Sequence, residues 1–201
     1  MENHDPIKGI TTGQVGKVQE LLGAALRKSD LQSEPSQQVL ENQGAQVIEE
    51  MVAVLRKYVE AVSSMIVRHV AVNRNRSPQE AIDATGRNKY LTDGVVAAMP
   101  QGEGGEADVF FFNLGRYISD ADLDKEYELR GLKPADSYAL AAVNESDPAF
   151  ADNHPNSTRW KDESGNWCYA AFNRWNDERN VGVGRRSDRW HDRWWFAGCR
   201  K

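Results

Sequence analysis

The sequence predicts an α+β fold in which a helical N-terminal region precedes a compact domain built from both strands and helices. Three observations support this prediction: apolar residues at helical spacing before residue 73, a Gly-rich segment after Pro100, and short β-prone runs beyond it. With 201 residues, 40% of them apolar and 27% charged, the chain can bury an ordinary core without metals or disulfides. We divide it into a helical region (1–100), a linker (101–106) and a compact domain (107–201).

Two helices are expected before residue 73. Thr11 and Gln14 have capping-box spacing, so the first helix is expected over about residues 12–28. A longer helix is expected over about residues 35–72, where the apolar stripe is wider than a two-stranded seam and favours a bundle. We therefore expect residues 1–100 to oligomerise or to dock on a different protein. The run SPQE at residues 77–80 predicts a third, short helix that ends at Gly86.

After the linker, the order of predicted elements is strand, two helices, then several short strands. The elements are a strand over 109–112, a helix from Ser119 to Gly131, a helix opened by Pro134 over 138–143, turns over 144–155, and strands from Thr158 onward. The core is expected to contain Val109, Phe111, Leu123, Leu140, Trp167, Tyr169, Phe172, Val181, Val183, Trp195 and Phe196.

The C-terminal end differs in composition from the rest of the chain. Residues 155–201 contain ten Lys and Arg against six Asp and Glu, a net charge of +4, although the whole chain carries −5. All six tryptophans lie in the same segment. A concentration of Arg and Trp predicts a binding surface, because these residue types dominate hot spots in protein interfaces.

The order of elements, the segment NRWNDERNVGVGRRSDRWHDR at 173–193 and the closing WWFAGCRK resemble a known family. The resemblance covers residues 107–201. It is to the C-type lectin fold in the version shared with formylglycine-generating enzymes, and more closely to the variable proteins of diversity-generating retroelements. In those proteins an error-prone reverse transcriptase randomises adenines, so that asparagine codons come to encode many other residues.

The resemblance implies a ligand-binding face in residues 173–193 and no catalysis. The positions that asparagine-type codons can reach are Asn173, Asn176, Asn180, Gly182, Gly184, Arg186, Ser187, Arg189, His191 and Arg193. The edges of Trp175 and Trp190 are expected to complete the face. Alternation along a strand would send Val181 and Val183 into the core and leave the glycines outside. The alternative is that Gly-Val-Gly is simply a tight strand or turn.

Three other functions compete with this interpretation. Trp175-Asn176-Asp177 matches the motif of calcium-dependent lectins, but no partner motif precedes it and calcium needs six to eight oxygen ligands. A catalytic relative would need Cys168 and Cys199 as activated thiolates, whereas their contexts predict packing. Single-stranded nucleic acid would suit the Arg and Trp residues, but acidic residues are interleaved with them. We expect a macromolecular ligand, a protein rather than a nucleic acid, and no cofactor.

The N-terminal sequence has no basic segment followed by an apolar one, and no apolar run approaches the length of a membrane span. We therefore expect a cytoplasmic protein without a signal peptide, unless another route exports it. Cys168 and Cys199 are not in a metal-ligand spacing, and two buried thiols are expected rather than one disulfide.

Overall fold

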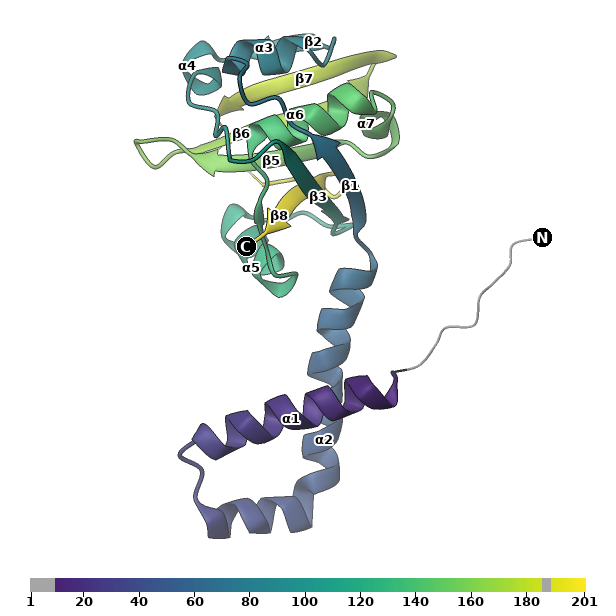
Figure 1. Cartoon of the computed structure of the whole chain (residues 1–201), viewed down its shortest axis with the longest axis vertical. Helices are drawn as coiled ribbons and strands as arrows, with labels where there is room; N and C mark the ends of the chain where they lie inside the picture. The colour runs from purple at the N-terminus through teal and green to yellow at the C-terminus, as the bar shows by residue number, and fades with distance from the viewer. Residues whose placement is uncertain (1–9, 186–188) are drawn as a thin grey trace, which may run out of the picture. The chain divides into compact units, whose positions relative to one another are not determined.

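The computed structural model describes residues 10–185 and 189–201, which form a mixed α/β structure (Figure 1). The helices are α1 (Thr12–Lys28), α2 (Ser33–Ser63), α3 (Pro78–Asp83), α4 (Asp93–Val96), α5 (Asp120–Leu129), α6 (Ser137–Ser146) and α7 (Phe150–Asn153). The strands are β1 (Ile66–Ala71), β2 (Asn88–Leu91), β3 (Glu106–Asn113), β4 (Leu132–Pro134), β5 (Asn156–Lys161), β6 (Trp167–Trp175), β7 (Glu178–Arg185) and β8 (Trp195–Arg200). The chain divides into two compact units, 1–54 and 55–201.

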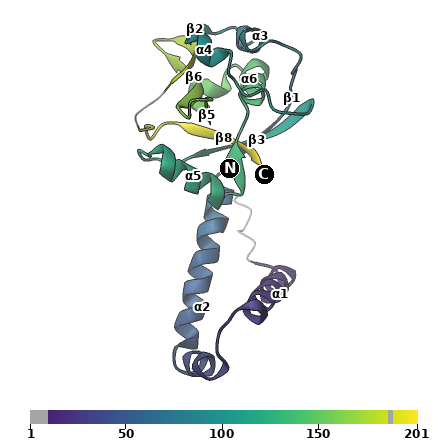
Figure 2. The same cartoon turned by 90° about the vertical axis from the view of Figure 1, so that its left-hand side faces the viewer.

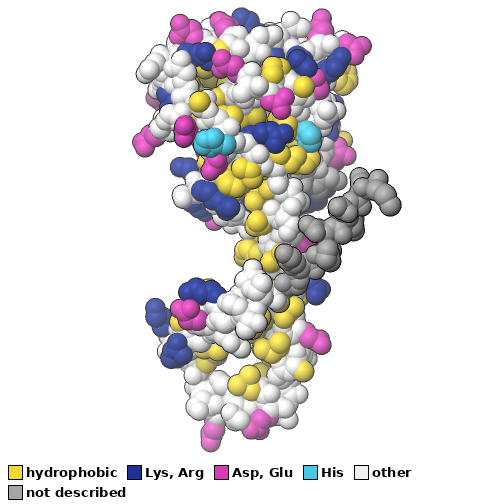
Figure 3. All heavy atoms as spheres, turned by 45° about the vertical axis from the view of Figure 1, so that its right-hand side comes forward, with side chains coloured by type: hydrophobic (Ala, Val, Ile, Leu, Met, Phe, Trp, Pro, Cys, Tyr) yellow, Lys and Arg dark blue, Asp and Glu magenta, His cyan; other side chains and the backbone are white. Residues whose placement is uncertain are grey.

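The first unit holds α1 and most of α2. The predicted capping box at the start of α1 is confirmed: Gln14 N donates to Thr11 Oγ1 at 3.3 Å, and Thr11 N donates to Gln14 Oε1 at 2.8 Å. No side chain of α1 is buried. Figure 3 shows the consequence, with hydrophobic side chains at the surface of the helices. In the part of the chain that is described, no helix combines the length and the apolar character needed to cross a membrane.

The second unit is built on one mixed sheet. The strand order is β1-β3-β8-β5-β6-β7-β2, and β4 adds to β8. The pairs β2–β7 and β5–β8 are parallel, and the other pairs are antiparallel. The two strands at the chain ends of the predicted compact domain lie side by side, with Phe112 opposite Phe196.

Each face of the sheet has its own hydrophobic core, because side chains alternate along β3. Phe111 faces the core that contains Leu140 of α6. Phe112 faces the opposite core, which contains Leu123 of α5 and Trp190. Figure 2 shows α5 and α6 on opposite sides of β3 and β8. The expected core residues that are buried are Val109, Phe111, Leu123, Leu140, Phe172, Val181, Val183 and Phe196; Trp167, Tyr169 and Trp195 are half-buried.

The long N-terminal helix ends earlier than the sequence predicted. It stops at Ser63, and residues 66–71 form β1, which pairs with β3 in register from Ile66 opposite Phe111. The three- and four-residue spacing continues past the true end of the helix, but the β-branched residues Ile66, Val67 and Val70 suit a strand once a partner strand is present. Residues 88–91, also inside the predicted helical region, form β2.

Two predictions in the middle of the chain are also wrong. Pro134 does not open a helix: it ends β4, and α6 begins after Asp136, whose side chain accepts a hydrogen bond from Ala139 N at 2.8 Å. Residues 144–155 are not only turns, because α6 continues to Ser146 and α7 follows. The predicted linker, residues 101–106, joins segments of the second unit, and β3 begins at its last residue.

Candidate ligand-binding face

The predicted face lies on one side of the hairpin formed by β6 and β7. In this hairpin Phe172 is opposite Val181, and Asn173 is opposite Asn180. Phe172, Val181 and Val183 are buried in the core under α6, which confirms the inward direction predicted for the valines. Because successive side chains alternate, Asn173, Asn180 and Gly182 face the other side.

A hollow of about 300 Å³ opens on this side of the hairpin. Its lining consists of Tyr90, Tyr169, Ala171, Asn173, Trp175, Asn180, Gly182, Trp190 and Trp194. Five of these residues were predicted for the face: Asn173, Trp175, Asn180, Gly182 and Trp190. Three of the other four lining residues are aromatic, so the hollow combines rings with a few polar groups, as small binding sites commonly do.

Four lining residues, Tyr90, Tyr169, Ala171 and Trp194, were not predicted for the face from the sequence. Tyr90 comes from β2, which pairs in parallel with β7 and places Tyr90 opposite Gly182. Its side chain remains 67% exposed. Tyr169 was assigned to the core, yet it faces the same side as Gly184, its opposite residue in β7. Alternation along β6 predicts the direction of Tyr169 and Ala171, but no local signal predicts the approach of β2.

Trp190 is more deeply placed than expected. It is 1% exposed, whereas an exposed edge was predicted, because its ring packs in the core that contains Phe112 and Leu123. Its backbone pairs with that of Ile118 through two hydrogen bonds of 2.9 and 3.1 Å. Its indole Nε1 donates to Asp120 Oδ1 at 3.0 Å. Its ring meets those of Tyr169 and Trp194 edge-on, with centroids 6.2 and 6.0 Å away. Trp190 therefore forms an inner wall of the hollow and anchors the segment before β8.

Two further positions predicted to be exposed are buried. Asn180 is 7% exposed, and its Nδ2 donates to the carbonyl oxygens of Glu178 at 3.0 Å and Trp175 at 3.5 Å. Gly184 is covered by Tyr169 and Thr92. Asn173 and Gly182 are half-buried; Trp175, Asn176, Arg189, His191 and Arg193 are exposed as predicted. Arg186 and Ser187 lie outside the described residues.

The Trp-Asn-Asp run forms the turn of the hairpin. Trp175 is opposite Glu178, and the two residues between them, Asn176 and Asp177, have φ angles of 51° and 62°. Asn and Asp tolerate this left-handed conformation better than other residues with side chains, and a two-residue hairpin of type I′ requires it at both central positions. Within 10–185 and 189–201, no three His, Cys, Asp or Glu side chains gather as metal ligands would. The turn geometry explains the residue types of this run.

The open rim of the hollow carries a cation. The guanidinium carbon of Arg193 lies 5.7 Å from the ring centroids of both Trp175 and Trp194. A cation at this distance from an aromatic face is attracted by the negative charge of the ring face. Next to it, His191 and Tyr117 are joined by a hydrogen bond of 3.0 Å between Nδ1 and the phenol oxygen.

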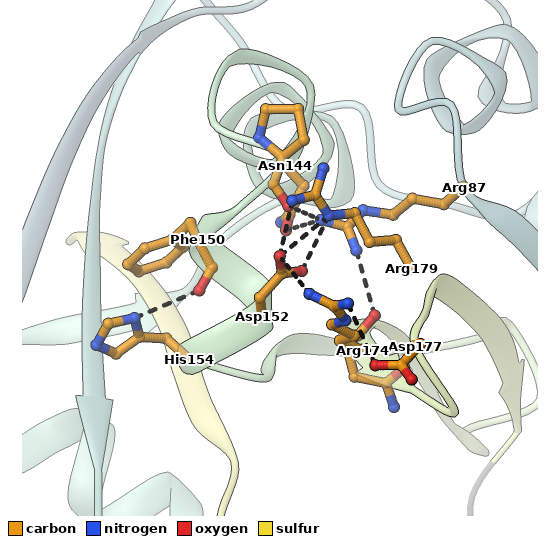
Figure 4. A network of polar contacts seen from close by, with 10 residues as sticks. Arg87, Asn144, Phe150, Asp152, His154, Arg174, Asp177 and Arg179 are labelled. Atoms are coloured by element: carbon orange, nitrogen blue, oxygen red, sulfur yellow. Dashed lines mark hydrogen bonds and ion pairs between the residues drawn. The ribbon is translucent and has the colours of Figure 1, made fainter.

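A polar network behind the hairpin holds the face in place (Figure 4). Arg87, which precedes β2 and is buried, donates to the carbonyl oxygens of Asn173 at 3.2 Å and Pro148 at 2.8 Å. Asp152 of α7 accepts from Arg179 of β7 at 2.7 Å. Burial lowers the pKa of Arg87, and the hydrogen bond from Arg179 lowers the pKa of Asp152. The network ties β2, β6 and β7 to the α6–α7 segment.

Both cysteines are free thiols that pack against the core under α6. Cys168 is buried and Cys199 is half-buried. Burial raises the pKa of both thiols, that of Cys199 to about 11. An activated cysteine has the opposite shift, because its thiolate must be stabilised.

In comparisons with known proteins, no family model, curated protein or solved structure matches this chain. Function must therefore be inferred from the residues of the face and their geometry. Two features bear most on function. One is the alternation of side chains across β6 and β7, and the other is the hollow lined by aromatic residues of β2, β6 and the segment before β8.

Replacement of Asp152 by Asn should make the protein less stable at pH 7, with a deficit that shrinks on acidification. The folded-state pKa of Asp152 lies below its unfolded value of about 3.9. The ionised carboxylate therefore adds to the free energy of unfolding at pH values above about 3.9, and this added stability is lost as the pH falls through the folded-state pKa. Thermal unfolding of both proteins across the acidic range measures this. The control is Glu163→Gln at the exposed β5–β6 turn, which should follow the wild type. A deficit for Asp152→Asn that is constant with pH would contradict the assignment.

Proposed function

We propose that this chain is a ligand-binding variable protein diversified by a retroelement. In this proposal, residues 107–201 belong to a C-type-lectin-like domain, and the surface formed by residues 173–193 binds a macromolecular ligand, a protein. The observation that carries the proposal is the division of β6 and β7 into a buried side with Phe172, Val181 and Val183, and an opposite side that opens on the hollow. Side chains on such a face can change while the core under them stays the same.

The backbone of the face can accept larger side chains at its central glycine. A Cβ at Gly182 would lie 3.6 Å from the ring of Tyr169 and 3.9 Å from the carbonyl oxygen of Tyr90, which are ordinary contact distances. Gly182 does not have a left-handed φ angle, so a side chain there causes no backbone strain. This tolerance is what diversification at the position requires.

The charges around the hairpin favour a protein ligand over a nucleic acid. Arg174 and Arg179 approach the carboxylate of Asp152, and Arg185 donates to Asp162 at 2.9 Å. These pairs neutralise guanidinium groups that a nucleic-acid site would direct at phosphates. Exposed Trp175, which is 57% accessible, and Arg193 are residue types that contribute strongly to protein interfaces.

Gly182→Asn should leave the free energy of unfolding within about 1 kcal/mol of the wild-type value, whereas Val181→Asn should lower it by about 3 kcal/mol or more. The first substitution adds a side chain to the hollow, and the second buries an amide without a hydrogen-bond partner in an apolar core. Chemical denaturation followed by tryptophan fluorescence compares the two variants. Equal losses would show that the two sides of β7 do not differ as proposed.

Natural variation should be confined to the proposed face. Sequencing this locus and its surroundings in a mixed population of the source organism should find substitutions confined to the positions of asparagine-type codons within residues 173–193. Trp175, Val181, Val183, Trp190 and Trp194 should stay constant, and a reverse-transcriptase gene should lie nearby. An invariant segment would overturn the retroelement proposal and leave a domain with an aromatic hollow.

We also propose that the N-terminal helices assemble copies of this chain. In α1 and the adjoining part of α2, Leu21 and Ile48 are 58% and 52% exposed, and similar apolar residues recur along both helices. Large exposed apolar surfaces on a water-soluble chain mark association sites. Joining several copies would raise the avidity of modest single sites without any new contact.

Combining Leu21→Asp with Ile48→Asp should lower the molar mass in solution toward the 22.6 kDa of one chain. A buried carboxylate without a partner opposes association of apolar helices. Light scattering coupled to size-exclusion chromatography measures the mass. The matched control is Gln19→Asp with Gln43→Asp, which adds the same charges at polar exposed positions and should keep the wild-type mass. A wild-type mass of 22.6 kDa would refute assembly.

A further inference from the structure

The second half of α2 carries a wide hydrophobic face with a strict seven-residue repeat. When residues 48, 55 and 62 are placed at position a of the repeat, every a, d, e and g position from 47 to 62 is hydrophobic. The residues at these positions are Val47, Ile48, Met51, Val52, Val54, Leu55, Tyr58, Val59, Ala61 and Val62. The charged residues of the segment all occupy positions b, c and f, and they are Glu49, Glu50, Arg56, Lys57 and Glu60. The helix therefore has a polar face limited to three of every seven positions.

The chain itself leaves this hydrophobic face open. The structure describes every residue of α2, and among them only Ala61 is buried. Val54 and Val59, which occupy positions g and e, are 59% and 55% exposed. Helices in proteins derive most of their stability from packing of an apolar face, and this 31-residue helix has almost no such packing within one chain. The face is therefore built for a partner outside the chain.

The repeat favours other copies of the same helix as that partner. A spacing of about 3.5 residues keeps the seam of one helix against another when the helices supercoil. In coiled coils, charged residues at positions e and g select the partner and the orientation. Only Val and Ala occupy these positions from 47 to 62. The segment therefore has no charges there that would select a different protein or repel an identical helix in register.

The width of the face indicates more than two copies. In a two-stranded coiled coil the a and d side chains form the seam, and e and g lie at its edges. In a bundle of three or more helices each helix has a neighbour on both sides, so the e and g side chains are covered as well. Val52, Val54 and Val59 would stay at the edge of a dimer but become buried in such a bundle. A closed ring of identical helices related by one rotation axis is parallel.

We propose that residues 47–62 form a parallel bundle of at least three copies of this chain through positions a, d, e and g. This inference rests on the proposed assembly of copies, and it specifies the contact surface, the number of copies and their direction. Leu55, Tyr58 and Val62 belong to the second unit, and β1 of that unit begins at Ile66, just beyond the face. The second units of all copies therefore lie at the C-terminal end of the bundle, where several candidate faces are available to one multivalent ligand.

The number of copies is tested by light scattering coupled to size-exclusion chromatography of the full chain. The mass should be at least three times the 22.6 kDa of one chain. Val52→Glu with Val59→Glu places two carboxylates at e positions and should lower the mass to two chains or one, because burial of unpaired charges opposes the wider bundle. The control, Gln46→Glu with Ala53→Glu, adds the same side chains at exposed f positions with the same spacing and should keep the wild-type mass. A wild-type mass of two chains, or an unchanged mass of the e-position variant, would overturn the bundle.

The direction of the helices is tested by cysteine cross-linking, which requires no disruptive substitution. Ile48→Cys and Val62→Cys, prepared separately, should each give covalent dimers with a short bis-maleimide, because each position adjoins the same position of a neighbouring copy. Ala53→Cys, at position f, and the wild type, whose cysteines are buried or half-buried, should give none. An antiparallel arrangement centred on Leu55 would instead link the first two variants only after they are mixed, and that result would overturn the parallel bundle.

Failure of this inference can be told apart from failure of the proposed function. If the wild type is a dimer that Leu21→Asp with Ile48→Asp dissociates, the assembly of copies stands and only the bundle of three or more is refuted. If the wild type has the mass of one chain, both the assembly and the bundle are refuted. Neither result bears on the diversified face, which depends on the variation found within residues 173–193.

Discussion

The alternation of side chains across the antiparallel pair β6–β7 is the constraint on which the rest of the site depends. Phe172 and Val181, opposite one another, are buried under α6, and this packing fixes the register of the hairpin. Once the register is fixed, every second residue must face the other side. Asn173, Asn180 and Gly182 therefore face the hollow for the same reason that their neighbours are buried.

The two ends of this hairpin are held in different ways. At the turn, Asn176 and Asp177 adopt the left-handed conformation that reverses the chain in two residues. Behind the strands, the bond between Asp152 and Arg179 ties β7 to α7. The segment that follows the hairpin is anchored separately, because Trp190 pairs with the backbone of Ile118. The rings of the hollow thus stand on backbone fixed by hydrogen bonds from several elements, which would lower the cost of ordering them in the proposed complex.

Local sequence features predicted those parts of the protein that depend on residues near one another in the chain. The capping box at Thr11 set the start of α1, and the one at Ser77 set the start of α3. Period-two alternation predicted that Val181 and Val183 would be buried. The same local reasoning failed beyond Ser63, because the apolar spacing there fits both a helix and a strand, and only pairing with β3 selects the strand.

The sequence by itself determined the mixed α and β composition, the starts of α1, α3 and α5, and the burial of Val181 and Val183. Tertiary structure alone decided that β2 pairs in parallel with β7 and brings Tyr90 to the hollow, and that Trp190 turns inward against Asp120. It also decided that Asn180, a polar residue on the predicted exposed side, is buried with an unpartnered oxygen. The physical reason is that exposure and pairing depend on which distant segments cover a strand, whereas alternation and capping depend only on the chain within a few residues.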